Sequence, residues 1–214
     1  MSRVARRTTK VAAVIVAAVA LAGCAGLHPG VAAKVGDETI TIREVDDFAH
    51  GLCVYLPNTP NGPSTHANAR SLAVGILVRS ALANQYGDRT SFQLDQSQIE
   101  ASLKSVESGV KDLSDDEREQ FLDAVRESLE GEQFASLAAR SALLAQGKNV
   151  DDQTVQAEVT RLYTEWSADE GVELDPRFGT WNKVDSKPGS GSLSVLAGSD
   201  TEPGSTLPGA QTCS

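Results

Sequence analysis

The sequence predicts a mainly α-helical domain with a small β-sheet that pairs an N-terminal hairpin with a C-terminal strand. Between residues 42 and 166, apolar residues recur at the three- and four-residue spacing of a helix face. After this region the period falls to two, which is typical of a strand, and before it two short extended runs flank a pair of residues suited to a hairpin turn. The chain of 214 residues is long enough to bury a core without disulfide or metal staples.

The first predicted elements are two short extended runs, residues 31–35 and 38–42, on either side of Gly36-Asp37. This pair suits the two-residue turn of a hairpin. A lone hairpin is only marginally stable in water, so we expect another element to pair with it.

The next elements are two helices separated by a loop rich in proline. Thr41 and Glu44 form a capping box, which predicts a helix that runs to about Cys53. A second helix is expected over about residues 65–86. Its apolar residues cover so wide a face that we expect more than one neighbour to bury it.

Capping residues also mark the later helices. Asp95 is expected to cap a third helix, and Ser114 with Glu117 forms a second capping box. The helix that this box opens is predicted to extend to Gly147, with Gly131 as a candidate break. A last helix begins after residue 151 or 152 and carries its apolar stripe to residue 166.

Alternation of apolar and charged residues predicts a closing strand over about Val172 to Trp181, which is the natural partner of the N-terminal hairpin. The domain is therefore expected to span residues 31–181. In residues 182–214 the apolar periodicity stops and small residues and prolines increase, so we expect a flexible tail.

The N-terminus predicts export from the cytoplasm. Four basic residues precede an uncharged run over residues 11–22, which is too short to span a bilayer of roughly 30 Å but suits the apolar part of a signal peptide. Leu21-Ala22-Gly23-Cys24 resembles the lipobox of bacterial lipoproteins. The resemblance implies cleavage after residue 23, a lipid on Cys24 that anchors the chain to the outer face of the cell membrane, and a tether over residues 24–30. An ordinary secretory signal with a chance cysteine is the alternative.

The overall composition excludes several classes of function. The chain has 19 basic and 29 acidic residues, a formal charge of −10, which argues against a nucleic-acid partner. Three cysteines do not make a disulfide-rich scaffold and leave no paired thiols in a zinc-finger pattern. We therefore expect neither a metal site nor a cofactor.

The residues that carry most chemistry do not predict an enzyme. The histidines are His28, His50 and His66, and the chain has neither a Gly-x-Ser-x-Gly elbow nor a His-Glu-x-x-His motif. The acidic run over residues 115–119 fits the first turn of a helix, where the helix dipole favours carboxylates. No catalytic residue is predicted.

Two thiols remain once Cys24 is lipidated. A disulfide between Cys53 and Cys213 is plausible outside the cytoplasm and would tie the tail to the first helix. The alternative is a buried Cys53 that acts as a small apolar residue, with a free thiol at Cys213.

Two motifs at opposite ends of the domain suggest a family. Residues 31–45, VAAKVGDETITIREV, resemble the start of the SurA and PrsA N-terminal domains, and residues 175–181, DPRFGTW, are similar to the closing strand of lipoproteins that carry this domain in high-GC Gram-positive bacteria. The resemblance implies a helical chaperone-type module related in fold to the C-terminal part of trigger factor. Many relatives also carry a parvulin isomerase domain between the last two helices, where this chain has only residues 148–150.

We therefore expect a lipid-anchored, extracytoplasmic chaperone-like protein that binds unfolded or exported polypeptides without ATP. An alternative is a structural lipoprotein that docks one dedicated envelope partner, and a peptidyl-prolyl isomerase is the least favoured function. The peptide-binding residues cannot be chosen from the sequence, because an apolar stripe that packs the core looks the same as one that binds a client.

Overall fold

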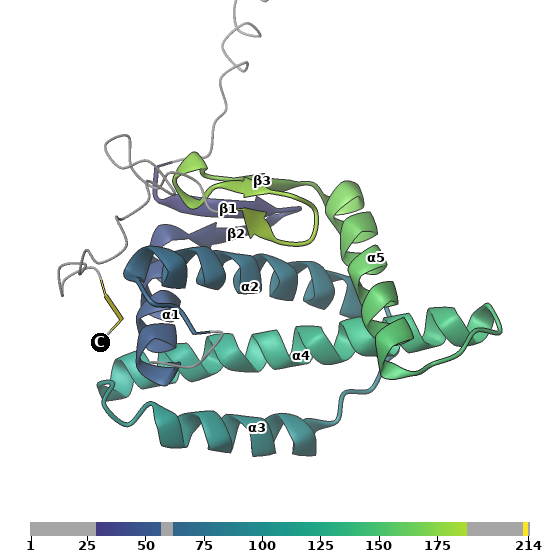
Figure 1. Cartoon of the computed structure of the whole chain (residues 1–214), viewed down its shortest axis with the longest axis horizontal. Coiled ribbons are helices and arrows are strands. Elements are labelled where there is room, and N and C mark those ends of the chain that lie inside the picture. The colour runs from purple at the N-terminus through teal and green to yellow at the C-terminus, as the bar shows by residue number, and fades with distance from the viewer. Residues whose placement is uncertain (1–28, 57–61, 188–211, 214) are drawn as a thin grey trace, which may run out of the picture.

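The computed structural model describes residues 29–56, 62–187 and 212–213. The predicted signal peptide, Cys24 and most of the predicted tether and tail lie outside these residues. Within them the chain is mainly helical with a small antiparallel sheet, as the sequence predicts (Figure 1). The elements are, in order, β1 (Val31–Val35), β2 (Glu38–Thr41), α1 (Ile42–Tyr55), α2 (His66–Gly87), α3 (Gln96–Gly109), α4 (Asp115–Ala145), α5 (Asp152–Glu170), β3 (Val172–Leu174), β4 (Thr180–Trp181) and β5 (Ser186–Lys187).

The three-stranded sheet has the order β2-β1-β3, so the first strand of the domain lies in the middle. The β1–β2 hairpin turns at Gly36, whose φ of +56° favours glycine. On the other side of β1, Ala33 pairs with Leu174 and Val35 pairs with Val172. The predicted pairing of the hairpin with the closing segment is therefore confirmed.

The closing segment itself is not the single strand that the sequence predicts over residues 172–181. After β3, a 3₁₀ turn over Pro176–Phe178 interrupts the extended backbone, with Asp175 as its cap. Proline cannot donate a ladder hydrogen bond, and Gly179 has a φ of +101°, a backbone conformation that favours glycine and departs from an extended strand. The segment then forms the β4–β5 hairpin, which carries the described structure to residue 187.

The helix starts agree with their predicted caps. Thr41 with Glu44 and Ser114 with Glu117 form capping boxes with both hydrogen bonds present. Asp95 caps α3, and Asp151 caps α5. Each cap satisfies backbone N–H groups that the helix cannot pair internally, so local sequence alone fixes these starts.

The candidate break at Gly131 is wrong, because α4 runs without interruption from residue 115 to residue 145. A Cβ on Gly131 would lie 3.2 Å from the Cα of Ser80 and 3.3 Å from the Cβ of Ala83, both on α2. The glycine therefore lets two helices approach closely.

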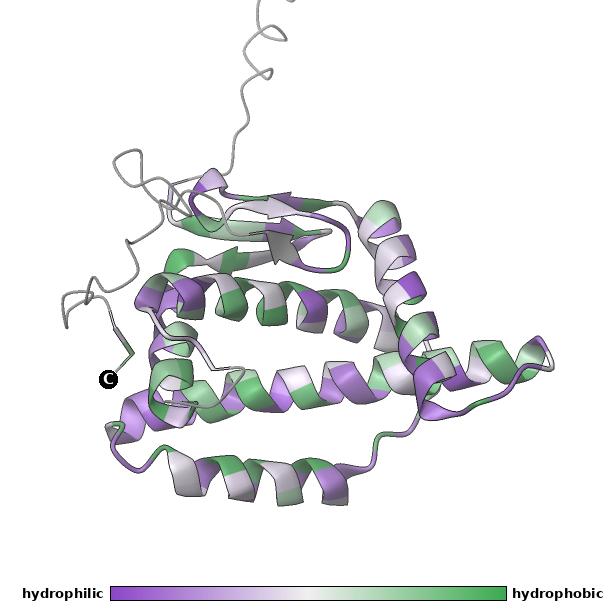
Figure 2. Cartoon of the chain, in the orientation of Figure 1, coloured by the Kyte–Doolittle hydropathy of each residue, from purple (hydrophilic) through white to green (hydrophobic). Residues whose placement is uncertain are grey.

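Helix α2 is the centre of the molecule, as the wide apolar face predicts. It lies between the sheet and α4 and also contacts α1 and α5 (Figure 1). Its Val74, Val78 and Leu82 are fully buried. Helix α3 packs against α4 on the side away from α2. Polar and apolar residues recur along α3, and its apolar stripe includes the buried Ile99 and Leu103 (Figure 2).

None of the helices in the described part of the chain is both long and apolar enough to cross a membrane.

Candidate functional site

A cleft of about 830 Å³ runs along α4, with the first half of α3 on one side and the first half of α5 on the other. Helix α4 forms its floor, and the side chains of Leu129, Gln133 and Leu137 line it. Because these residues recur every four positions, they form one stripe along the helix. The turn between β4 and β5 closes one end through Val184 and Asp185.

The lining of this cleft mixes apolar side chains with neutral polar ones. Leu129, Leu137 and Val159 are half-buried apolar residues that face the cleft. Four glutamines and three serine or threonine residues lie among them: Gln93, Gln98, Gln133, Gln156, Ser102, Ser136 and Thr160. Amides and hydroxyls both donate and accept hydrogen bonds, so they can pair with the backbone of a bound peptide whatever its sequence.

One glutamine also sets the position of the cleft wall. The Gln133 side-chain oxygen accepts from the Asp95 backbone N–H at 2.8 Å, and its amide nitrogen donates to the Asp95 carbonyl at 3.3 Å. Asp95 is the cap of α3, so these bonds fasten the start of α3 to the middle of α4. The width of the cleft at this end follows from that attachment.

Charged residues of both signs also line the cleft. Arg79 of α2 lies 3.1 Å from the Asp185 carboxylate. Burial raises the pKa of Glu132, and the Arg79 charge partly offsets this. Burial also raises the pKa of Tyr163 to about 12, so its hydroxyl stays protonated and can donate a hydrogen bond at neutral pH.

A second hollow of about 380 Å³ lies between β2, α1, α2 and α4, and its rim is acidic. Phe48, Leu77 and Ala81 contribute apolar wall. Burial raises the pKa of Glu127, and neighbouring carboxylates raise it further. Five carboxylates and one arginine line this hollow: Glu38, Glu44, Asp47, Asp123, Glu127 and Arg43.

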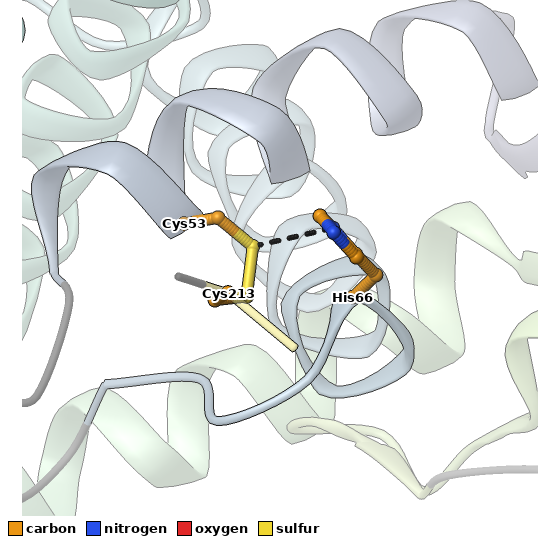
Figure 3. Close-up of side chains that lie close together, drawn as sticks. All are labelled: Cys53, His66 and Cys213. Atoms are coloured by element: carbon orange, nitrogen blue, oxygen red, sulfur yellow. Dashed lines mark hydrogen bonds between the residues drawn. A yellow bond between two sulfur atoms is a disulfide. The ribbon is translucent and has the colours of Figure 1, made fainter. Parts of the chain in front are cut away.

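Cys53, Cys213 and His66 form a separate cluster at the ends of α1 and α2. Cys53 lies in the last turn of α1, and His66 is the first residue of α2. Cys53 and Cys213 are joined by a disulfide, and the Cys53 Sγ lies 3.6 Å from the Nδ1 of His66 (Figure 3). Both sulfurs belong to buried residues, whereas His66 is exposed.

Backbone contacts hold Cys213 against this end of the molecule. Its N–H donates to the Ser64 carbonyl at 3.3 Å. The preceding residue, Thr212, forms an antiparallel bridge with Thr65, the N-cap of α2. Thr212 and Cys213 are thus attached to the segment that leads into α2.

The other predicted chemistry-bearing residues are not brought together. His50 lies on α1, where its Nε2 is 3.8 Å from a Glu117 oxygen, and His28 lies outside the described residues. Hydrogen bonds from Ser114 lower the pKa of Glu117, which serves the capping box. The acidic run over residues 115–119 opens α4, as the sequence predicts.

Two features escape analysis of the sequence. The cleft depends on how far α3 and α5 stand apart on α4, and no local pattern encodes that separation. The place of His66 beside the disulfide depends on which helix ends meet. Its one signal is that His66 follows Cys53 by a short, proline-containing loop that joins two helices.

Protein-family models give no match to the chain, and searches of curated proteins and of solved structures find none either.

Proposed function

We propose that the chain is a lipid-anchored, extracytoplasmic chaperone-like protein that holds segments of unfolded or exported polypeptides in the cleft along α4. It does so without ATP and without isomerase chemistry. The observation that carries this proposal is the lining of the cleft, which combines apolar side chains with amides, hydroxyls and a few charged groups.

This lining suits an unfolded polypeptide better than a single small molecule. A volume of about 830 Å³ falls within the range of small-molecule sites, roughly 300–1,000 Å³, so the lining and not the size favours a polypeptide. Apolar patches on Leu129 and Leu137 give affinity for exposed apolar side chains, and the glutamines satisfy peptide groups that would otherwise lose water. Such contacts place few demands on the client's sequence.

The proposed anchor keeps the cleft near the membrane. Cys24 precedes β1 by seven residues, and a chain of this length reaches at most about 25 Å. Clients that leave the membrane would therefore meet the domain at short range. The acidic surface of the chain is repelled by anionic lipids, so the lipid on Cys24 supplies the membrane contact.

Aggregation of an unfolded client tests this function directly. The chain without residues 1–23 and with Cys24→Ser is titrated into a chemically unfolded client while light scattering is followed. We expect suppression at near-stoichiometric ratios. No suppression by a chain that circular dichroism shows to be folded would contradict a general chaperone and favour a dedicated envelope partner, to be sought by membrane pull-down.

A pair of substitutions on α4 tests the role of the cleft. Leu137→Glu puts a charge into the lining and is expected to weaken suppression at least tenfold. Leu144→Glu is the matched control, because Leu144 lies two turns further along the same helix, is 65% exposed and is not part of the lining. Equal activity of the two variants would remove the cleft from the proposal.

A further inference from the structure

We propose that Cys53, Cys213 and His66 form a metal site that the disulfide keeps closed and that reduction opens. The ligand would be a thiophilic cation with a filled d shell, Zn²⁺ or Cu⁺, because two thiolates and one imidazole form a donor set that both ions favour. This proposal does not rest on the chaperone function and involves a different part of the molecule.

The geometry of the cluster fits such an ion. The ligand atoms of Cys53, Cys213 and His66, two Sγ and one imidazole nitrogen, lie within 4.8 Å of one another. A zinc ion with bonds of about 2.3 Å to sulfur and about 2.0 Å to nitrogen holds these atoms roughly 3.5 Å apart in a tetrahedron. The distance from Cys53 Sγ to His66 Nδ1 is already 3.6 Å. The two sulfurs must separate, and the Cys213 Sγ must come closer to the imidazole nitrogen; cleavage of the S–S bond permits both movements.

The backbone around the cluster is fixed by contacts that do not need the disulfide. Cys53 and His66 belong to two helices that pack on each other. Cys213 is held by the hydrogen bond to Ser64 and by the bridge between Thr65 and Thr212. The three donors therefore stay near one another after the S–S bond is cleaved.

The position of His66 distinguishes this cluster from a disulfide with a structural role alone. A structural disulfide needs no imidazole against its sulfur, yet Nδ1 points at Cys53 Sγ (Figure 3). His66 is exposed while both cysteines are buried, so an ion reaches the sulfurs from the imidazole side. A water completes four-coordinate zinc, whereas Cu⁺ can remain three-coordinate.

Opening of the site is a thiol–disulfide exchange with a dithiol reductant. One thiolate of the dithiol attacks a sulfur of the Cys53–Cys213 bond and forms a mixed disulfide with it. The second thiolate then attacks the reductant's own sulfur in this mixed disulfide and displaces the protein thiolate. The protein S–S bond breaks and one S–S bond forms in the reductant. The reductant supplies two electrons and two protons, which convert Cys53 and Cys213 to thiols. Binding of the cation then releases those two protons to solvent.

Competition for metal against a coloured chelator tests the proposal. The chain without residues 1–23 and with Cys24→Ser is studied oxidised, and after reduction with dithiothreitol followed by its removal without oxygen. Zn²⁺ is offered with 4-(2-pyridylazo)resorcinol, and Cu⁺ is offered with bathocuproine disulfonate. We expect the reduced chain to take one equivalent of at least one ion and the oxidised chain to take none.

The histidines supply a matched pair of variants. His66→Ala is expected to weaken binding by the reduced chain at least tenfold. His50→Ala, which removes an imidazole from α1 outside the cluster, should leave binding unchanged. Bound metal should also raise the melting temperature of the reduced wild-type chain by mass action, and it should not do so for His66→Ala.

Three binding results would overturn the proposal. The first is that neither ion binds the reduced chain, and the second is that the oxidised chain binds metal equally well. The third is that His66→Ala binds as the wild type does. If reduction unfolds the chain, the ion must restore its circular dichroism spectrum. Failure to restore it would likewise overturn the proposal.

Discussion

The two sides of α4 are packed in opposite ways. On one side α1 and α2 approach so closely that a Cβ on Gly51 would lie 2.1 Å from the Phe121 ring, and one on Gly131 would lie 3.2 Å from the Ser80 Cα. On the other side α3 and α5 stand apart and leave the cleft. One helix therefore contributes to the core on one face and forms the floor of a proposed binding site on the other. The distance at which the neighbouring helices pack on each face makes the difference.

This difference predicts where the fold is sensitive. Phe121 is 2% exposed, and its ring lies 5.4 Å from that of Phe48. Leu129 and Leu137 on the cleft side are only half-buried. Substitutions on the closed side should change the free energy of unfolding, whereas substitutions on the open side should mainly change binding.

Loss of the disulfide should have the largest effect, because it ties the closed side to the end of the chain. Cys53 and Cys213 are 160 residues apart, and chain entropy predicts that closing such a loop stabilises the fold by about 5 kcal/mol. Cys213→Ser is therefore expected to lower the free energy of unfolding in urea by that order. Cys24→Ser is the control and should change nothing, and a loss below about 1 kcal/mol for Cys213→Ser would contradict the prediction.

Removal of the Phe121 ring should be the next largest effect. Phe121→Ala leaves a cavity beside Phe48 and Gly51 and is expected to cost about 4 kcal/mol. Leu144→Ala on the same helix removes an exposed side chain and should cost no more than about 0.5 kcal/mol. Urea unfolding of both variants measures the contrast, and similar losses would show that α4 has no closed side.

A salt bridge on α5 should have a smaller effect with a defined pH dependence. Arg161 donates to both oxygens of Glu158, and these hydrogen bonds lower the pKa of that buried carboxyl. Glu158 therefore stabilises the fold above its unfolded pKa, and this stability is lost as the pH falls through the lowered folded value.

Because the guanidinium is half-exposed, Glu158→Gln is expected to cost only about 1 kcal/mol at pH 7 and almost nothing near pH 2. Glu165→Gln is the matched control, since Glu165 pairs with the same arginine but is exposed. A loss for Glu158→Gln that does not vary with pH would rule out the ion pair as its cause.

The smallest expected effect is a gain in the free energy of unfolding, from a substitution at the acidic hollow. Partial burial and neighbouring carboxylates raise the pKa of Glu127, so the fold loses stability as the pH rises from the unfolded pKa to the raised folded pKa, and the whole loss is present above it. Glu127→Gln should stabilise the chain by about 0.3 kcal/mol at pH 7, since the group is largely exposed, and by nothing below pH 4. Thermal melts at the two pH values measure this, and destabilisation at pH 7 would contradict it.

The sequence was sufficient where local chemistry decides the structure. Capping boxes at Thr41 and Ser114 mark helix starts because their hydrogen bonds involve residues only three positions apart. The pairing of β1 with β3 was also predictable, because a lone hairpin needs a partner and the alternating segment after residue 172 is the other strand that the sequence predicts. These inferences require no knowledge of how the helices pack.

The sequence was insufficient where two distant surfaces decide the structure. Gly131 looks like a helix break, but its small size serves the approach of α2. Leu137 belongs to an apolar stripe that could equally fill a core or line a cleft. His66 gains its place beside Cys53 only when α1 and α2 come together. Each of these features depends on a neighbour that is far away in sequence or that a loop positions.

The position of β1 in the sheet has a consequence for the order of folding. During synthesis from the N-terminus, β1 and β2 are complete early. Ala33 of β1, however, pairs with Leu174, which follows the five α-helices of the described part. The hairpin must therefore wait for β3, and contacts between such distant residues form slowly. A chain that stops before β3 exposes one edge of β1, and an open edge pairs readily with a strand from another molecule. Synthesis that ends early would thus yield a species that needs a chaperone itself.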